Sequence, residues 1–313
     1  MTRAFIFPGQ GSQAVGMGRD LYDAFAEAKD VFEEIDESLG KKLSKIIFEG
    51  PESDLGLTEN TQPALMAVSM AVVRVLQKQG GIDLAKSAKF VAGHSLGEYS
   101  ALTAAGSLEI PVTAKLLNLR GQSMQKAVPV GVGAMAAVLG PSFEDVLQVA
   151  KDTACEVAND NSVGQVVISG KKEAIERAVA LATERGAKRA ILLPVSAPFH
   201  CSLMEPAAKI MEGALNETNL KAPSPAVVSN VTAQSVSDPT QIKQLLVQQV
   251  TGLVRWRESV LWMKEQGVSE MIELGAGKVL NGLVKRIDKD IAVDSVSSPE
   301  QIEALITKLN SKA

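Results

Sequence analysis

The chain has 313 residues, of which 46% are hydrophobic, 22% charged and 4% aromatic, and its formal net charge is −4. This length allows one large domain with an insertion or two domains, and the composition is that of an ordinary globular protein. The charge excludes a general attraction to nucleic acid or to an anionic membrane, and no apolar run approaches the ~20 residues of a membrane span.

A short strand and a helical segment open the chain. Residues 3–7 (RAFIF) predict a buried strand, and their apolar run is too short for a signal peptide. Residues 21–40 are acidic and amphipathic, with apolar side chains at helical spacing throughout. We therefore expect a strand followed by a helical segment that continues to residue 40.

A long helix and a strand–turn–helix unit come next. Thr61 is expected to cap the long helix, with Pro63 inside its first turn and Gly80 at its end. This helix is apolar nearly all round and should be buried. Residues 88–95 predict a second strand, which a sharp turn joins to a helix, and a further helix starts at Pro111.

The pattern changes between residues 128 and 195. There the periodicity predicts strand, helix, two strands, helix and strand, which is the β-α-β-β-α-β order of the ferredoxin-like arrangement. We predict that residues 128–195 form an inserted subdomain. Residues 1–127 and 196–313 would then form the main body, where alternating strands and helices indicate an α/β sheet.

Ser95 lies in a segment typical of a catalytic nucleophile. The sequence GHSLG at 93–97 fits G-x-S-x-G, and the glycines allow a tight turn that exposes the serine hydroxyl above a new helix. The backbone N–H of Leu96 would then face the acyl oxygen. The alternative is a serine that only caps the helix.

The base for such a serine can be sought among only two histidines. His94 precedes Ser95 and should point away from it at a sharp turn, whereas His200 follows the subdomain on a loop before a helix. We expect His200 to be the base, with a structural histidine as the alternative. The order Ser95–His200 without a marked acid argues against a standard hydrolase triad, so a backbone or amide carbonyl could orient the imidazole.

Arg120 is predicted to lie on the apolar face of the helix that starts at Pro111. A buried guanidinium needs a partner, and a carboxylate matches it bidentately. By base rate that carboxylate belongs to the protein, and Glu98 is a candidate. The other interpretation is a carboxylate on the substrate, in which case the acyl group carries a free acid.

Residues 9–14 (GQGSQA) fit the G-x-G-x-x-A dinucleotide fingerprint after a strand, which raises a nicotinamide-dependent oxidoreductase as a rival class. However, the loop continues through Gly16 and Gly18, and the acidic stretch near 30–37 is helical rather than the end of a second strand. We therefore expect no dinucleotide site, although this loop could offer backbone N–H groups to an oxyanion.

Seven motifs together resemble one family. They are FPGQGSQ (7–13), TQPAL (61–65), GHSLGEYSAL (93–102), RGQSMQKAVPVGVGAM (120–135), NDNSVGQVVISG (159–170), PFHCSLM (198–204) and ELGAGKVLNGL (273–283). They look like the bacterial malonyl-CoA:acyl carrier protein transacylases, occur in that family's order and span almost the whole chain.

The resemblance implies an α/β-hydrolase-like core with a parallel sheet and a ferredoxin-like subdomain. It also implies ping-pong transfer of malonyl from coenzyme A to the phosphopantetheine thiol of acyl carrier protein, which supplies fatty acid elongation. Malonyl-CoA and acyl carrier protein would be the partners, with no nucleic acid and no membrane. We expect no cofactor and no metal. The two cysteines, Cys155 and Cys201, cannot build a disulfide framework and suit a reducing cytoplasm.

The resemblance assigns roles residue by residue. It implies that Ser95 carries the malonyl ester, that His200 is base and then acid, and that Arg120 binds the malonate carboxylate. The remaining matches are the backbone oxyanion donors Gln10 and Leu96, the histidine-orienting Gln249, and the pocket residues Met124 and Asn161. Two alternatives stay open on the same scaffold: a serine hydrolase or thioesterase, and an acyltransferase for another acyl group such as methylmalonyl.

Overall fold

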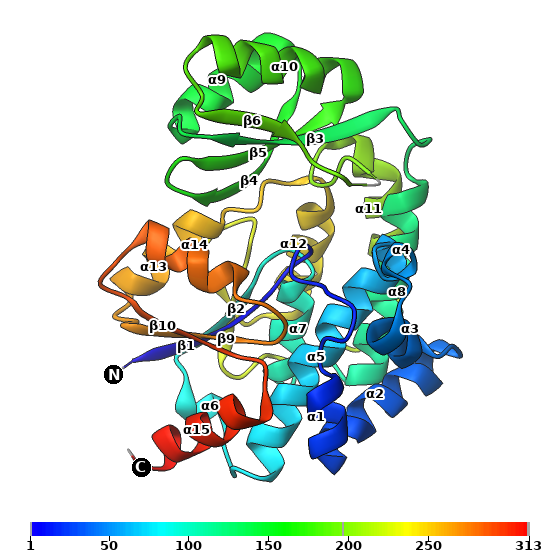
Figure 1. Ribbon diagram of the computed structural model, residues 1–313, viewed down its shortest axis with the longest axis vertical. Helices are drawn as coiled ribbons and strands as arrows, with labels where there is room; N and C mark the ends of the chain where they lie inside the picture. The colour runs from blue at the N-terminus through cyan, green and yellow to red at the C-terminus, as the bar shows by residue number, and fades with distance from the viewer. Residues whose placement is uncertain (1, 196, 312–313) are drawn as a thin grey trace.

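The computed structural model describes residues 2–195 and 197–311 and contains two β-sheets with their covering helices (Figure 1). The larger sheet has the order β10-β9-β1-β2-β7-β8. Its strands are β10 (Ala292–Val296), β9 (Glu270–Leu274), β1 (Arg3–Phe7), β2 (Phe90–Gly93), β7 (Ala226–Val228) and β8 (Ser235–Val236). Neighbours are parallel except β8, which pairs antiparallel with β7 at one edge.

Helices cover both faces of this sheet, and β1 shows why. Phe5 and Phe7 belong to the hydrophobic cluster on one face, whereas Ala4 and Ile6 belong to the cluster on the other. Successive side chains of a strand point to opposite faces, so the apolar run Ala4–Phe7 of β1 requires cover on both. The predicted buried strand over 3–7 is confirmed.

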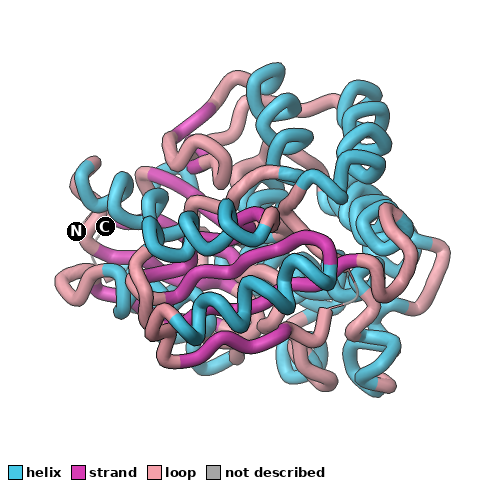
Figure 2. The backbone as a smooth tube through the Cα atoms, turned by 90° about the horizontal axis from the view of Figure 1, so that it is seen from above, coloured by secondary structure: helices cyan, strands magenta, loops and turns pink. Residues whose placement is uncertain are grey.

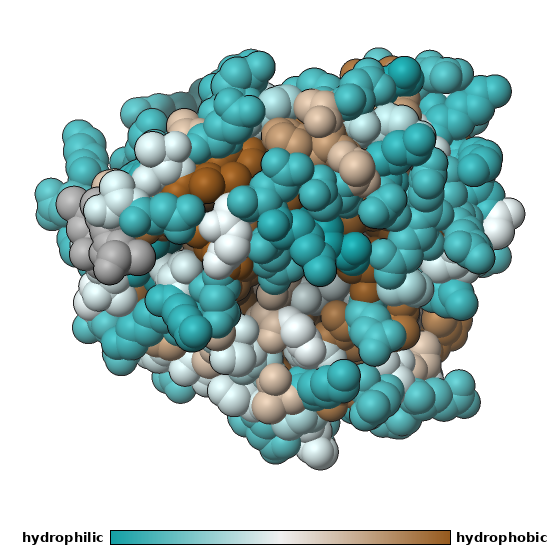
Figure 3. Space-filling model, turned by 90° about the horizontal axis from the view of Figure 1, so that it is seen from below, coloured by the Kyte–Doolittle hydropathy of each residue, from teal (hydrophilic) through white to brown (hydrophobic). Residues whose placement is uncertain are grey.

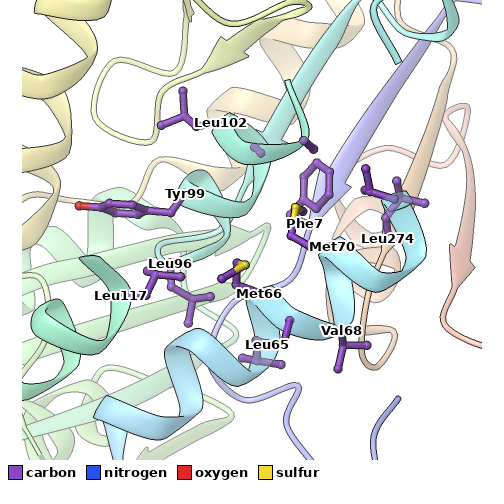
Figure 4. Packing of buried hydrophobic residues seen from close by; sticks show 14 of the residues in the cluster. Phe7, Leu65, Met66, Val68, Met70, Leu96, Tyr99, Leu102, Leu117 and Leu274 are labelled. Atoms are coloured by element: carbon purple, nitrogen blue, oxygen red, sulfur yellow. The ribbon is translucent and has the colours of Figure 1, made fainter. Parts of the chain in front are cut away.

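The larger cluster lies between the sheet and a thick layer of helices. Figure 4 shows Met66 and Met70 of the central helix of this layer packed in the cluster with Phe7 and Leu96. The α-helices that contribute buried residues here are α1 (Arg19–Ala24), α2 (Ala26–Leu39), α3 (Leu43–Glu49), α4 (Glu52–Leu55), α5 (Thr58–Lys78), α6 (Leu84–Ser87), α7 (Gly97–Ala104), α8 (Ile110–Lys126), α11 (Glu205–Glu217), α12 (Pro239–Thr251) and α15 (Pro299–Asn310). The long helix α5 is buried nearly all round, as predicted.

The opposite face of the larger sheet carries a smaller cluster. It is covered by α13 (Trp256–Glu265) and α14 (Val279–Ile287). A short 3-10 helix, η1 (Ser202–Met204), precedes α11 on the other side of the sheet. The α/β fold with a parallel sheet is therefore confirmed.

The smaller sheet is antiparallel and has the order β4-β5-β3-β6. Its strands are β3 (Gly133–Leu139), β4 (Glu156–Ser162), β5 (Gln165–Lys171) and β6 (Arg189–Leu192), and its helices are α9 (Phe143–Thr153) and α10 (Lys172–Glu184). Both helices lie on the face turned away from the main body (Figures 1 and 2). The element order and strand order are those of the ferredoxin-like arrangement. The predicted limits 128–195 remain a prediction, and residue 196 lies outside the described residues.

Buried polar contacts fasten the small sheet to the main body. The Arg257 guanidinium of α13 forms an ion pair of 2.7 Å with Asp160 of β4, whose side chain is fully buried. Beside this ion pair, the backbone N–H of Asp160 donates to the carbonyl of Val254, and the N–H of Val254 donates to the carbonyl of Ala158. These contacts set the end of β4 over the larger sheet, where its side chains can face the turn after β2.

Two local predictions were wrong. The helical pattern over 21–40 is interrupted at Phe25, whose backbone is extended, so that α1 (Arg19–Ala24) and α2 are separate helices. Phe25 packs against the larger cluster from this break. The start of α5 was predicted too late: the helix begins at Thr58, so Thr61 does not cap it and Pro63 lies beyond its first turn. The Thr61 hydroxyl instead donates to the carbonyl of Leu55 at 2.5 Å. At Phe25 tertiary packing overrides the local helical signal, whereas at Thr61 the hydroxyl binds a carbonyl of the short helix α4 just before α5.

Within the described residues, no helix is long and apolar enough to cross a membrane. The face seen from below is covered largely by hydrophilic side chains, and hydrophobic ones show mainly in the hollows between them (Figure 3).

Candidate active site

The turn between β2 and α7 holds Ser95 in the left-handed region, with φ 53°. A Cβ at Gly93 would lie 1.9 Å from the backbone of Gly97, and one at Gly97 would lie 2.3 Å from the carbonyl oxygen of Phe7. Only glycine fits either position, because the backbones are in contact. Asn230 holds the turn: its Oδ1 accepts from the Ser95 N–H at 2.7 Å, and its Nδ2 donates to the Gly93 carbonyl at 2.7 Å. Ser95 therefore lies on a strained strand-to-helix turn of the kind that exposes a nucleophile.

His200 is the histidine that reaches this serine. The distance from its Nε2 to the Ser95 Oγ is 2.8 Å, and the distance from its Nδ1 to the backbone oxygen of Gln249 is 2.8 Å. A carbonyl oxygen can only accept, so Nδ1 carries the proton and the bare Nε2 of the neutral ring faces the hydroxyl. The arrangement supplies a serine with a general base in the correct tautomer, and a backbone carbonyl takes the place of a triad acid.

The imidazole of His200 is kept neutral by its surroundings. Burial, and then the positive charge of Arg120, lower its pKa to about 3. The ring is 4% exposed. The ring is therefore in the neutral form across the physiological range, which is the protonation state that can accept the serine proton.

Arg120 lies on the buried side of α8 as the spacing predicted, and it is 1% exposed. Its guanidinium donates to Gln62 Oε1 at 2.7 Å, to Gln249 Oε1 at 2.8 Å and to Ser95 Oγ at 3.2 Å. It also lies 5.8 Å from the centre of the Tyr99 ring, within the range of a cation–π contact.

The expected protein carboxylate is not the partner of this arginine. Among the described residues, no carboxylate forms an ion pair with Arg120. The base-rate expectation of a pair with Glu98 is therefore wrong, because two neutral amide oxygens reach the guanidinium first. The Nε of Arg120 is buried and makes no hydrogen bond within the described part of the chain. A cation held only by neutral acceptors can still take a carboxylate.

Glu98 instead lies beneath the turn, in the first turn of α7. Its Oε2 accepts from the Gln249 Nε2 at 2.7 Å and from the Asn230 N–H at 3.2 Å. Burial raises the pKa of this carboxyl to about 7, although these hydrogen bonds lower it in part. The same Gln249 Nε2 also donates to the Ser95 carbonyl at 3.0 Å.

Ser95, His200 and Arg120 open into one cleft of about 380 Å³ between the two sheets. Small-molecule sites commonly have this size. The main body contributes Gly9, Gln10, Gly11, Gln13, Gln62, His94, Ser95, Leu96, Arg120, Met124, Phe199, His200, Val279, Leu280 and Leu283 to its lining. The smaller sheet and the segment after it contribute Met135, Ala137, Asn159, Asn161, Gln165, Val167, Leu193, Pro194 and Val195.

The remaining predicted residues also lie in this cleft. Gln10 and Leu96 line it beside Ser95, and Leu96 is the N-cap residue of α7; their role as oxyanion donors stays a prediction. Met124 lines it, and its sulfur lies 3.7 Å from the Gln62 Nε2. Asn161 faces His94 with 2.8 Å between its Oδ1 and the Nε2 of the ring.

Two residues of the site were missed by sequence reasoning. Gln62 could have been noticed as a polar side chain in a buried apolar helix, since such a group needs a partner. Asn230 follows β7 in a loop and carries no local signal. Within the described residues, no group of three or more acidic, histidine or cysteine side chains gathers as metal ligands.

Comparison with known proteins agrees with this geometry. Residues 4–306 match the family model of the acyl transferase domain. The malonyl CoA-acyl carrier protein transacylase of Bacillus subtilis (strain 168) is 46% identical over 311 residues, which cover 98% of this chain and 96% of that relative.

Solved structures are similar as well. An acyl-carrier-protein-S-malonyltransferase from Bartonella henselae superposes with a TM-score of 0.97 at 54% identity, covering 99% of this chain and 100% of that one. A chain from the complex of a type II PKS acyl-carrier protein with its malonyl-transacylase superposes with a TM-score of 0.95 at 41% identity, covering 98% and 100%.

Proposed function

The chain belongs to the acyl transferase domain family, and from that premise we propose that it moves a malonyl group from coenzyme A to the phosphopantetheine thiol of an acyl carrier protein. The observation that carries the proposal is the position of Ser95 Oγ between His200 Nε2 at 2.8 Å and Arg120 Nη2 at 3.2 Å. The imidazole of His200 activates the hydroxyl, and the guanidinium of Arg120 can bind a carboxylate on the acyl chain. The product supplies fatty acid elongation.

The first half-reaction transfers the acyl group to Ser95. The Oγ attacks the thioester carbonyl while His200 Nε2 takes the hydroxyl proton, and the carbonyl oxygen becomes an oxyanion. The backbone N–H groups of Gln10 and Leu96 stabilise that oxyanion. When the C–S bond breaks, the coenzyme A sulfur takes the proton from His200, and a malonyl ester remains on the serine.

The second half-reaction reverses these roles. The phosphopantetheine thiol of the carrier protein gives its proton to His200 and attacks the ester carbonyl. The Ser95 oxygen then leaves and takes the proton back. Because the first product departs before the second substrate reacts, one base serves both steps and the kinetics are ping-pong.

Arg120 selects the acyl group. Its guanidinium is within hydrogen-bonding distance of Ser95 Oγ, so an acyl chain on that oxygen meets it after very few bonds. A short dicarboxylic acyl group such as malonyl places its free carboxylate there, and the guanidinium binds it bidentately. Acetyl lacks that carboxylate and does not gain this ion pair.

We propose that no cofactor or metal takes part, since a serine, a histidine and backbone N–H groups account for every proton and charge in the two steps. We also propose a cytoplasmic location. Cys155 and Cys201 are both free thiols, which is consistent with a reducing compartment.

The test is intact mass spectrometry after the protein is mixed with malonyl-CoA alone, with Ser95→Ala as the matched control. The expected result is a malonyl adduct that persists, is absent from Ser95→Ala, and disappears when holo acyl carrier protein is added. Rapid release of free malonate without an adduct would refute transfer and favour a hydrolase. Equal adduct formation from methylmalonyl-CoA would refute malonyl as the preferred acyl group.

A further inference from the structure

We propose that Glu98 is a positioning residue that sets the orientation of the Gln249 amide and, through it, the placement of Arg120 toward the acyl group. This inference rests on the proposed function and adds the element that aligns the carboxylate-binding arginine. Glu98 is 1% exposed and is not among the described residues that line the cleft, so it acts through its neighbours.

The Gln249 side chain connects a cation to an anion. Its Oε1 accepts from the Arg120 Nη2 at 2.8 Å, and its Nε2 donates to the Glu98 Oε2 at 2.7 Å. A reversed amide would set its NH₂ against the guanidinium, which is donor only, and its oxygen against the carboxylate, which is acceptor only. Three acceptors hold the NH₂ in the orientation that gives Arg120 an acceptor: the Ser95 carbonyl at 3.0 Å, the Asn230 Oδ1 at 3.4 Å and the Glu98 carboxylate at 2.7 Å, which is the charged one and has the shortest distance.

The same carboxylate supports the turn of the nucleophile. The Asn230 N–H donates to it at 3.2 Å, and the Asn230 side chain holds the Ser95 N–H and the Gly93 carbonyl. Glu98 thus touches both residues that support the reacting groups, although it touches no reacting group itself. One buried side chain aligns the nucleophile's turn and the arginine together.

Glu98 is also costly to bury, which argues against a purely structural role. Its hydrogen-bond partners are neutral groups, and burial raises its pKa to about 7 although these bonds and the nearby charge of Arg120 lower it in part. An apolar side chain of the same size would fill this space without desolvating a carboxyl. A charged acceptor at this position is explained by the donors that it orients.

The test compares malonyl-CoA with acetyl-CoA as the donor for acylation of Ser95. In Glu98→Leu the Gln249 NH₂ loses its charged acceptor and keeps only the Ser95 carbonyl at 3.0 Å and the Asn230 Oδ1 at 3.4 Å, so the amide holds Arg120 less firmly. The malonyl-to-acetyl ratio of kcat/KM should therefore fall by at most about 10- to 150-fold, the range for one hydrogen bond to a charged group. In Glu98→Gln, which keeps an acceptor oxygen, the ratio should stay within about threefold of the wild type. Equal losses for both donors in Glu98→Leu would overturn the proposal.

A second variant tests the same connection from its other end. Gln249→Leu keeps the backbone carbonyl that orients His200 but removes the amide, so it should lower the ratio in the same way. The double variant of Glu98→Leu and Gln249→Leu should show no further fall, because both changes break one chain of hydrogen bonds. Additive losses would overturn the proposal. If Glu98→Leu proves unfolded by circular dichroism, Gln249→Leu must still lower the ratio and Glu98→Gln must not.

The control is Glu270→Leu. Glu270 is a buried glutamate at the start of β9, outside the cleft, and pairs with Arg3 and Lys308. Its loss should cost stability and leave the malonyl-to-acetyl ratio unchanged, whereas a changed ratio would mean that the readout reports folding and would overturn the inference. A wild-type protein that forms no malonyl adduct would refute the proposed function itself. A wild type that forms the adduct, with an unchanged ratio in Glu98→Leu, would refute only the role of Glu98.

Discussion

Removing the guanidinium of Arg120 should separate malonyl transfer from acetyl transfer. In the structure this group donates to two amide oxygens and to Ser95 Oγ, and no carboxylate of the described residues pairs with it. In Arg120→Ala a malonyl group would have to bury its carboxylate in the cleft without a partner. An acetyl group would meet only a larger cavity.

The magnitude follows from the burial of the pair. Breaking a buried ion pair by removing one partner costs about 3–5 kcal/mol. Since each 1.36 kcal/mol is tenfold in rate, kcat/KM for malonyl-CoA should fall roughly 150- to 5,000-fold. Acetyl-CoA has no carboxylate to lose, so its kcat/KM should stay within about tenfold, the value of one hydrogen bond to Ser95 Oγ.

The assay is the transfer of each acyl group to holo acyl carrier protein, measured as the acylated carrier protein by mass spectrometry, because each thiol released from coenzyme A is matched by one consumed on the carrier. Arg74→Ala is the matched control, because Arg74 lies outside the cleft and pairs with Glu34 near the surface. It should leave both rates unchanged. Equal losses of malonyl and acetyl transfer in Arg120→Ala would refute the assignment of this residue to the substrate carboxylate.

Three further outcomes follow from single residues. Because burial and the charge of Arg120 lower the pKa of His200 to about 3, this base stays neutral as the pH falls and should give kcat/KM no limb between pH 8 and 5. A limb near 7 belongs to the Glu98 carboxyl, whose pKa burial raises to about 7, and should be absent from Glu98→Gln; a half-loss near 6.5 that persists in Glu98→Gln would contradict the depressed pKa of His200. Gly93→Ala should lower the free energy of unfolding in urea by about 3 kcal/mol or more and form no adduct, because its Cβ would lie 1.9 Å from backbone atoms. The control is Gly213→Ala on the open surface of a helix, which should raise the free energy of unfolding by about 0.5–1 kcal/mol. Similar changes in both variants would refute the steric argument. Arg257→Met should lower the free energy of unfolding by about 3 kcal/mol, because the fully buried Asp160 loses its only ion-pair partner among the described residues. An unchanged denaturation midpoint would show that this ion pair does not hold the smaller sheet to the main body.

Local patterns were sufficient where the chemistry depends on adjacent residues. The strand, glycine turn and helix around Ser95 follow one another in the chain, and the structure has the strained backbone that the G-x-S-x-G pattern predicts. His200 was expected because the chain has only two histidines, and it is the one within 2.8 Å of the serine. Helical spacing placed Arg120 on a buried face, where it lies.

Local patterns failed where packing between distant segments decides the outcome. The helical pattern over 21–40 contained no sign of the break at Phe25, which packs against the core. Thr61 has the chemistry of a helix cap, yet its hydroxyl serves the carbonyl of Leu55 because α5 starts one turn earlier. Both positions depend on contacts with another element, the core at Phe25 and helix α4 at Leu55, and the local pattern does not contain these contacts.

The amino-acid sequence by itself determined the nucleophile, its turn, the base and the buried arginine, because each rests on residue type and short-range spacing. Only the tertiary structure decided what those groups face. Gln62 from α5 and Gln249 from α12 are 58 and 129 residues away from Arg120, and they replace the expected glutamate as its partners. These hydrogen bonds form because the three helices pack together in the fold, and a single sequence gives no distances between segments that are far apart in the chain.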